Sequence, residues 1–391
     1  MTEATRAETI RTDIAIIGGG IAGASLAFRL APHRRVVVLE REAQPGYHTT
    51  GRSAASLSEN LGTPVARALT AMTRPFFTNP PAGFTPVPLM APLGWLFIAR
   101  EDQRQAYEAS FAEARATSPR VRELGRESSC ALHPLLKPAY VAHAYLEPDA
   151  MALDVDAILQ AYYRAFRAAG GRLVTGAEVR AMSRASGEWR IETGAGTFEA
   201  PVVVNAAGAW AEAIGRLAGV KPIGLVPKRR TAMILDAPPG VNNASWPELD
   251  CVGGEFYLKP EAGKFLASPC DETPSEPTDA QPDEMDVAIC VDRVEQATTL
   301  AVRRVERRWA GLRSFVADRN PVAGFAPETE GFFWLAGQGG VGIQTSAGLS
   351  ETAATLILGH DWPALLKARN IAPIHLSPAR AMAAVPGGNA L

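Results

Sequence analysis

The stretch DIAIIGGGIAGASLAFRL, residues 13–30, decides the fold. Its apolar run at residues 14–17 is typical of a short strand buried on both faces of a parallel sheet. A glycine-rich turn and a helical pattern over residues 21–30 follow it, and RVVVLE, residues 35–40, adds a second buried strand. Strand, turn, helix and strand together predict a compact βαβ unit.

The glycines of this unit have the GxGxxG spacing, at Gly18, Gly20 and Gly23. The first permits a tight turn, the second lets a pyrophosphate approach the backbone, and the third lets helix and strand pack closely. The phosphates would lie at the positive end of the helix dipole. Glu40 ends the second strand, where a carboxylate accepts ribose hydroxyls. These features predict an adenine dinucleotide site.

The segment after this strand favours FAD over NAD. Instead of a second helix the chain continues as REAQPGYHTTGRSAAS, residues 41–56, which is rich in small and polar residues. Small residues allow close approach to a bulky ligand, Thr49, Thr50 and Ser53 offer hydroxyl donors, and Arg52 can meet a phosphate. The alternative is a plain surface loop.

The strand, small-residue turn and helix pattern recurs at residues 201–219 and 331–358. Proline-rich segments with alternating strand-like runs lie between these regions, and DETPSEPTDAQPDE, residues 271–284, is predicted to be a solvated loop. The predicted fold class is α/β (α+β), with a Rossmann-like FAD-binding domain built from discontinuous segments and a mixed-sheet substrate-binding domain. The FAD-binding domain is expected at residues 10–77, 151–220 and 326–375, and the substrate-binding domain at residues 78–150 and 221–325.

Composition excludes several other classes. A chain of 391 residues exceeds the usual single-core size, and a net charge of −2 gives no indication of a nucleic-acid partner. The four cysteines lack CxxC spacing, so neither a metal site nor a disulfide framework is expected. The polar first 12 residues lack the apolar core of a signal peptide, and no apolar stretch is long enough to span a membrane. We therefore expect a cytoplasmic protein, with peripheral contact at the inner face of the membrane left open.

Five segments together resemble the flavoprotein D-amino-acid oxidase family, and within it the bacterial catabolic D-arginine and D-amino-acid dehydrogenases. These segments are DIAIIGGGIAGAS with VVVLERE, GRSAA, VVNAAGAWA, WAGLRSFVADRNPVAG and GQGGVGIQTSAG. The resemblance extends from about residue 12 to residue 350 and implies FAD bound without a covalent link. The implied cofactor residues are Gly18, Gly20, Ala22, Gly23, Glu40 and Arg41 around the ADP half, Thr49, Thr50, Gly51, Arg52, Ser53, Ala54, Ala55 and Ser56 along the flavin half, Val179, Gly208 and Trp210, and Gly339, Gly340, Val341, Gly342, Ile343 and Gln344.

The substrate end is predicted from charge and from the same resemblance. A planar arginine binds a carboxylate in bidentate fashion, and Arg313 matches the family's substrate-carboxylate arginine. Arg230 and Tyr257 match two further substrate contacts, and the Gly340 carbonyl is an acceptor for the substrate amine. His48 lies in the cofactor loop but is not needed as a carbon base, and His133 and His143 are expected to be structural.

The residues that select the substrate side chain depart from the arginine-using relatives. Ser56, Leu61 and Trp95 stand where those relatives hold imidazole, phenol and carboxylate groups. An apolar wall disfavours a cation. Glu248 and Asp250 are expected on a loop over the pocket, as an acidic lid exposed to water rather than as a cation site.

The sequence thus predicts oxidative deamination of D-amino acids with neutral or apolar side chains, by hydride transfer from Cα to the flavin N5. The electrons would pass to a quinone-like carrier or to oxygen. The alternatives are oxidation of D-arginine, D-lysine, secondary amines or 2-hydroxy acids, and, more remotely, flavin binding without turnover.

Overall fold

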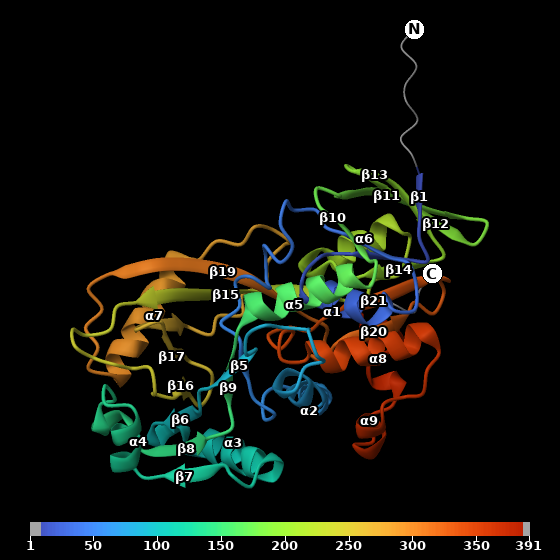
Figure 1. Ribbon diagram of the computed structural model, residues 1–391. Coiled ribbons are helices and arrows are strands. Elements are labelled where there is room, and N and C mark those ends of the chain that lie inside the picture. The colour runs from blue at the N-terminus through green and yellow to red at the C-terminus, as the bar shows by residue number, and fades with distance from the viewer. Residues whose placement is uncertain (1–8, 386–391) are drawn as a thin grey trace.

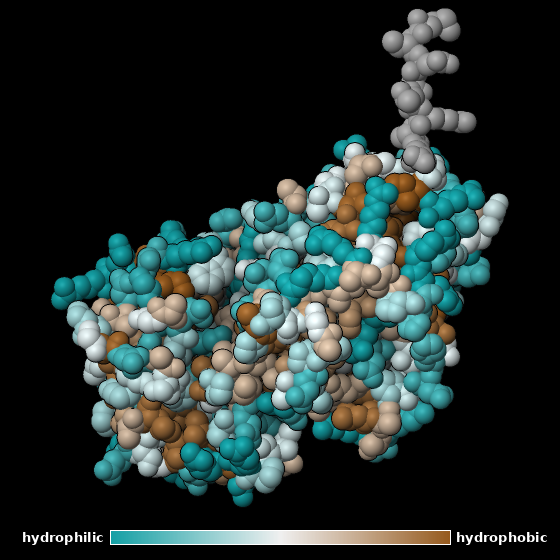
Figure 2. Space-filling view, viewed as in Figure 1, coloured by the Kyte–Doolittle hydropathy of each residue, from teal (hydrophilic) through white to brown (hydrophobic). Residues whose placement is uncertain are grey.

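The computed structural model describes residues 9–385, so the first eight residues of the polar N-terminal segment lie outside it. Figure 1 shows two parts side by side, with α1, α5 and α8 in one and the long strands β15 and β19 with α7 in the other. On the face seen in Figure 2, hydrophilic side chains cover most of the surface and apolar ones form separate patches.

The first part is built on a six-stranded sheet in the order β10-β3-β2-β14-β21-β20, parallel except for β20. Its strands are β2 (Ile14–Ile17), β3 (Val36–Leu39), β10 (Arg172–Val174), β14 (Val202–Asn205), β20 (Val322–Phe325) and β21 (Phe332–Ala336). On one face pack α1 (Ile21–Leu30), α5 (Val155–Ala168) and α8 (Ser346–Leu358), with α2 (Pro64–Thr78) against α8. The predicted Rossmann-like βαβ unit is confirmed.

The other face of this sheet is covered by a smaller sheet in the order β1-β13-β12-β11. Its strands are β1 (Thr9–Arg11), β11 (Val179–Ala185), β12 (Glu188–Thr193) and β13 (Gly196–Ala200), and α6 (Ala211–Leu217) lies beside it. Trp189 and Ile191 of β12 are both buried in this layer, as alternation in the sequence predicts.

The second part is an eight-stranded mixed sheet in the order β19-β15-β18-β17-β16-β6-β8-β7. Its strands are β6 (Trp95–Ala99), β7 (Arg122–Leu124), β8 (His143–Glu147), β15 (Val226–Leu235), β16 (Glu248–Cys251), β17 (Tyr257–Glu261), β18 (Lys264–Ser268) and β19 (Val305–Phe315). Helices α3 (Arg104–Thr117), α4 (Arg126–Leu132) and α7 (Glu284–Ala297) pack around it. The mixed sheet agrees with the predicted architecture, while the domain boundaries stay a prediction.

The remaining elements are small. Strands β4 (Ser56–Leu57), β9 (Met151–Leu153) and β5 (Met90–Pro92) form a three-stranded sheet, and α9 (Ala364–Ala368) and α10 (Pro378–Ala383) follow α8. Single 3₁₀ turns occur at Glu101–Gln103, Pro138–Tyr140, Gly208–Trp210 and Pro373–His375.

One of two loop predictions is wrong. Residues 248–251 form strand β16, which pairs with β6 and β17 inside the second sheet. The acidic segment 271–284 is a largely exposed loop, as predicted. Its start is anchored, because Asp271 accepts hydrogen bonds from the backbone and hydroxyl of Thr231. Glu272 also pairs with Arg319. Partners distant in sequence hold both segments in place.

Candidate cofactor and substrate site

Three connected cavities run from the carboxyl ends of the parallel strands to the second sheet. The first two share Gly20, Thr49, Thr50, Ala206 and Gly208. The first and third share Ser53, Ala54, Arg230, Tyr257, Arg313, Gln338 and Gly340. Ligands of open parallel sheets bind at this edge, so one extended ligand and a smaller one beside it fit the arrangement.

The glycine turn keeps its backbone open to this channel. Gly18 has a φ of +107°, which favours glycine, and a Cβ on Gly23 would lie 2.0 Å from the Gly18 carbonyl oxygen. Gly20 precedes α1 without a side-chain cap, and the Ile21 N–H donates to Thr50 Oγ1 at 3.0 Å. The helix N-terminus therefore faces the channel, where phosphates are stabilised.

At one end of the channel lies the ribose and adenine region. Glu40 accepts from the backbone N–H groups of Gly19 at 2.7 Å and Glu42 at 2.8 Å, and its side chain lines this cavity. Fixed by these bonds, the carboxylate retains lone pairs for ribose hydroxyls. Val179 and Trp210 line the same cavity, and the Arg41 guanidinium lies 4.3 Å from the Trp210 ring centroid.

The segment 49–56 is held by the second sheet rather than by the Rossmann-like sheet. Thr49 Oγ1 donates to the Leu312 carbonyl at 2.8 Å, and the Trp309 indole donates to the Arg52 carbonyl at 3.0 Å. Lys259 is buried and donates to the carbonyls of Ala54 and Ala55 at 2.5 and 3.1 Å. The cofactor loop therefore connects the two parts of the molecule.

Arg52 is already engaged. Its guanidinium pairs with Asp279 and donates to the carbonyls of Ala280 and Ala310 at 3.0 and 2.9 Å. These bonds argue against the predicted phosphate contact, although Arg52 lines the channel.

Unsatisfied polar atoms show that the channel fits a polar cofactor. Among residues 9–385, Ser314 Oγ and Gln338 Nε2 are buried without a hydrogen-bond partner, and both residues line the first cavity. Buried polar groups normally have hydrogen-bond partners. A ligand with hydrogen-bond acceptors along its edge would supply the partners that these two groups lack. Sequence reasoning missed both, although Ser314 follows Arg313 and Gln338 lies inside the motif GQGGVGIQTSAG.

Most predicted cofactor residues line one of the three cavities, with three exceptions. Gly23 packs against Gly18, Gly51 is exposed, and the Gln344 side chain accepts from the Ser58 backbone at 3.1 Å. Gly339 to Ile343 precede α8 and line the channel, as the resemblance implies.

Arg313 lies where the cofactor channel meets the third cavity, which has a volume of about 780 Å³. A Cβ on Gly340 would lie 2.9 Å from Arg313 Nη1, so the guanidinium packs against the glycine backbone. Burial and the neighbouring Arg230 lower the pKa of Arg313. Within residues 9–385 no carboxylate forms an ion pair with it. A half-buried arginine whose charge is not balanced by a protein carboxylate is suited to bind an anion.

Arg230 and Tyr257 complete this end of the cavity. Arg230 Nε donates to the Asp271 carbonyl at 2.8 Å, which fixes the side chain while its outer nitrogens face the cavity near Glu272. Burial raises the pKa of Tyr257 to about 12, so its hydroxyl stays a neutral donor. The three predicted substrate residues are thus brought together.

Glu248 and Asp250 correct the sequence prediction, because they lie on β16 and line the third cavity instead of forming an exposed lid. Glu248 is 4% exposed and accepts from Ser56 Oγ at 2.5 Å. Burial raises the pKa of both carboxyl groups, and Asp250 is shifted well above its ordinary value. Alternating with Leu249 and Cys251 in the core, they face the cavity by strand periodicity.

The wall of the third cavity also contains Ser56, Leu61 and Trp95, the three positions expected to differ from the arginine-using relatives. Trp95 is buried, and its indole N–H has no partner within residues 9–385. Leu61 is 38% exposed at the rim, and Ser56, at the end of the loop, contacts Glu248. Trp95 and Glu248 are directly opposite each other in the β6 and β16 ladder.

The histidines lie away from the third cavity. His48 contacts Glu42 at 2.9 Å and packs on Trp210 at the adenine end. His133 is fully buried and packs on Trp246, and His143 packs on Tyr107. His133 and His143 have the structural places expected of them.

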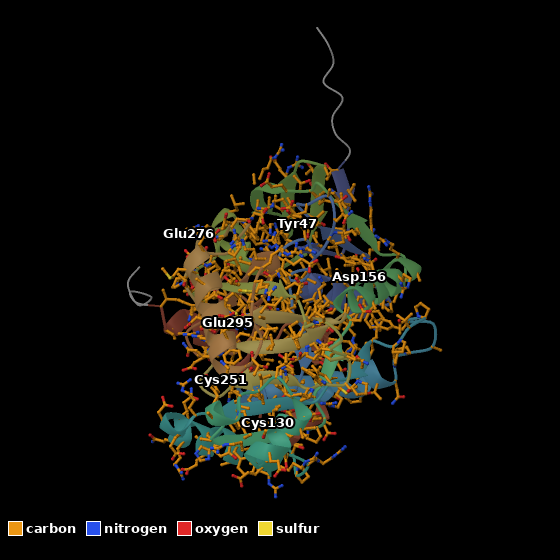
Figure 3. The ribbon with its side chains drawn as sticks, turned by 90° about the vertical axis from the view of Figure 1, so that its left-hand side faces the viewer. Tyr47, Cys130, Asp156, Cys251, Glu276 and Glu295 are labelled. Carbon is orange, nitrogen blue, oxygen red and sulfur yellow. The ribbon has the colours of Figure 1, made fainter. Side chains whose placement is uncertain are left out.

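Across residues 9–385 no cluster of metal-ligating side chains occurs and no helix is long and apolar enough to cross a membrane. All four cysteines are free. Figure 3 places Cys130 and Cys251 together in the lower part of the molecule, far from Tyr47 of the cofactor loop.

The family described as DAO, FAD dependent oxidoreductase, matches residues 13–356. The chain belongs to this family. Its cofactor is therefore FAD, and the protein is an FAD-dependent oxidoreductase of the DAO family.

Several proteins of known name and structure are similar to this chain. Glycine oxidase from Geobacillus kaustophilus is 25% identical over 354 residues, covering 86% of this chain and 90% of that protein. Its crystal structure matches with a TM-score of 0.78 and 24% identity, covering 90% and 96% of the two chains. Human mitochondrial sarcosine dehydrogenase is 26% identical over 370 residues, or 88% of this chain, but the chain spans only 39% of that relative's length. L-α-glycerophosphate oxidase from Mycoplasma pneumoniae, solved with FAD bound, has the same fold, with a TM-score of 0.80, 17% identity and coverage of 89% and 95%.

Proposed function

We propose that the protein oxidises the amine of a D-amino acid to an imino acid, which water converts to a 2-oxo acid and ammonia. Arg313 carries the proposal, because this half-buried guanidinium, which has no ion-pair partner among residues 9–385, faces the junction between the cofactor channel and the substrate cavity. A substrate carboxylate would satisfy it with a bidentate pair.

Arg313, Arg230 and Tyr257 would fix the carboxylate, and the Gly340 carbonyl would accept a hydrogen bond from the amine. These contacts hold the Cα–H bond toward the cofactor, so the chain contributes mainly by positioning. FAD, held without a covalent link by the residues of the channel, would supply the two-electron acceptor for the hydride. The final electron acceptor, oxygen or a quinone-like carrier, is part of this proposal.

The predicted preference for neutral side chains rested on an apolar cavity wall and on Glu248 and Asp250 forming an exposed lid. The second argument fails, because both acids line the cavity. We therefore propose a second candidate, a D-amino acid with a cationic side chain. Glu248 is buried directly across the strand pair from Trp95, where the arginine-using relatives are expected to hold a carboxylate. In this protein the carboxylate would therefore come from Glu248 on β16 instead of from the position of Trp95 on β6, at the same level of the cavity.

An anaerobic absorbance scan of the purified flavoprotein tests both candidates. The panel contains D- and L-alanine, D- and L-methionine, D- and L-arginine, sarcosine and D-lactate. Bleaching of the oxidised flavin band by D-amino acids alone supports the proposal, and the ranking of D-methionine against D-arginine separates the two candidates. Bleaching by sarcosine or D-lactate alone would contradict both, and no bleaching would favour flavin binding without turnover.

A further inference from the structure

A proton must leave the substrate before the proposed hydride transfer. An amino acid at neutral pH carries an ammonium group, whose nitrogen has no lone pair to stabilise the product as hydride leaves Cα. A group on the cavity wall that accepts one N–H proton would let the abundant ammonium form react near neutral pH.

No histidine can fill this role, because within residues 9–385 none lines the third cavity. Two other ionisable groups of the wall stay protonated, since burial raises the pKa of both Tyr257 and Cys270 to about 12. At the mouth, Glu113 pairs with Arg67 and Glu272 pairs with Arg319. Deeper in the cavity, two acids remain.

Of these two acids, Glu248 is already bound. Its carboxylate accepts the Ser56 hydroxyl, and the charge of buried Lys259 acts on it from the neighbouring strand. Asp250 differs, because among the described residues no hydrogen bond or ion pair occupies its carboxyl oxygens, and the residue lines the cavity. It is directly opposite Tyr257 in the β16 and β17 ladder, so the two side chains lie on the same face.

We propose that Asp250 accepts the proton that the substrate ammonium loses before hydride transfer. The inference rests on the proposed function of the same cavity. In this step one N–H bond breaks, an O–H bond forms on Asp250, and the electron pair stays on nitrogen. The Cα–H then leaves as hydride to FAD, and Asp250 returns its proton to water through the open cavity as the imino acid departs.

The charges around Asp250 suit this role. Burial and the adjacent Glu248 raise its pKa well above the ordinary value, while Arg230 and Arg313 act in the opposite direction. A carboxylate with a raised pKa is a stronger base once ionised. The titratable and charged groups that face Asp250 are Glu248 on β16, Tyr257 on β17, Cys270 after β18, Arg230 on β15, Arg313 on β19 and Tyr145 on β8.

The test compares Asp250→Asn with the wild type and with Glu113→Gln, a control at the cavity mouth. Anaerobic stopped-flow reduction of the flavin by the fastest D-amino acid of the panel is measured across the pH range in which the holoenzymes are stable. We expect the limiting wild-type rate to rise with pH through one ionisation. In Asp250→Asn that ionisation should disappear, and the rate should fall about a hundredfold near neutral pH and follow the ammonium's own ionisation. Glu113→Gln should keep the wild-type profile.

A carboxylate without an amine separates proton transfer from a structural role. Propionate binding, followed by the change in flavin absorbance, should be at least as tight in Asp250→Asn, because a negative charge is removed from beside the arginines. Loss of propionate binding would mean that Asp250 only holds the clamp in place and would overturn the proposal. The role of Asp250 would also be overturned if D-amino acids still reduced the flavin of Asp250→Asn with an unchanged pH profile. That result would leave the proposed function intact. If no D-amino acid reduced the flavin of the wild type, both the role of Asp250 and the proposed function would be contradicted.

Discussion

At the scale of single residues, Arg313 has the most direct consequence. Hydrogen bonds to charged groups contribute about 1.5–3 kcal/mol each, so loss of a bidentate pair costs about 3 kcal/mol or more. Arg313→Met should lower kcat/KM for D-amino acids by about a hundredfold or more. The kcat/KM of Arg313→Lys should lie between those of the wild type and Arg313→Met, because lysine keeps the positive charge but cannot form the planar bidentate pair.

The matched control for Arg313 is Arg67→Gln, since Arg67 lines the same cavity but pairs with Glu113 at the mouth. Steady-state kinetics of the three variants decide the point. A value of kcat/KM for Arg313→Met near that of Arg67→Gln would contradict the carboxylate site.

Ser314 makes a separate prediction about the cofactor. Its hydroxyl is buried with no hydrogen-bond partner in the described part of the chain, and the residue lines the cofactor channel. Ser314→Ala should therefore leave the stability of the apoprotein unchanged or slightly higher, while weakening FAD binding by about 1 kcal/mol, roughly fivefold. Fluorescence titration of the apoprotein with FAD measures the second effect, and unchanged affinity would place the hydroxyl away from the cofactor.

At the scale of elements, the cofactor loop depends on the segment around residues 279 and 280. Arg52→Met removes hydrogen bonds to the buried carbonyls of Ala280 and Ala310, and should weaken FAD binding by about 1.4 kcal/mol, or tenfold. Asp279→Asn removes only a half-exposed partner and should change FAD affinity by less than about 0.5 kcal/mol. Equal effects of the two substitutions would show that the ion pair, not the carbonyl contacts, holds the loop.

Strand β16 shows where sequence patterns reach their limit. The glycine turn and the buried strands of the βαβ unit follow from local patterns, and the structure confirms them. In WPELDCVGG, however, the alternation of Glu248 and Asp250 with Leu249 and Cys251 is equally consistent with a loop or with a strand facing a polar cavity. Only the pairing with β6 and β17 decides, and those partners are distant in the sequence.

The same limit applies to the site. Motifs pointed to Arg313, Arg230 and Tyr257, which the structure brings together at one cavity, and to most of the residues that line the channel. The partners of Arg52 were not predictable, because Asp279, Ala280 and Ala310 are more than 200 residues away along the chain. Whether an acid faces water or a cavity is set by such tertiary contacts.

At the scale of the whole molecule, His133 makes stability depend on pH. Burial lowers its pKa from 6.5 to about 4, so the folded protein takes up the proton later than the unfolded chain as the pH falls. Above pH 6.5 the residue is neutral in both states and has no effect. Below it, the unfolded chain gains a proton first, and stability should fall by about 2 kcal/mol by about pH 5.

Urea unfolding near pH 7 and about pH 5 measures this loss in the wild type and in His133→Leu. The variant loses packing but should show a smaller difference between the two conditions. His33→Gln, at an exposed site, is the control and should behave as the wild type. An equal loss in His133→Leu would contradict the assignment to His133.

The central claim is that the two parts of the molecule hold a D-amino acid by its carboxylate against FAD. The most direct measurement is the anaerobic rate of flavin reduction by the D and L enantiomers of one amino acid, in the wild type and in Arg313→Met. The account predicts rapid flavin reduction by the D enantiomer alone, at a rate that falls by a hundredfold or more in Arg313→Met. Equal reduction by both enantiomers, or a D rate that survives the loss of Arg313, would contradict it.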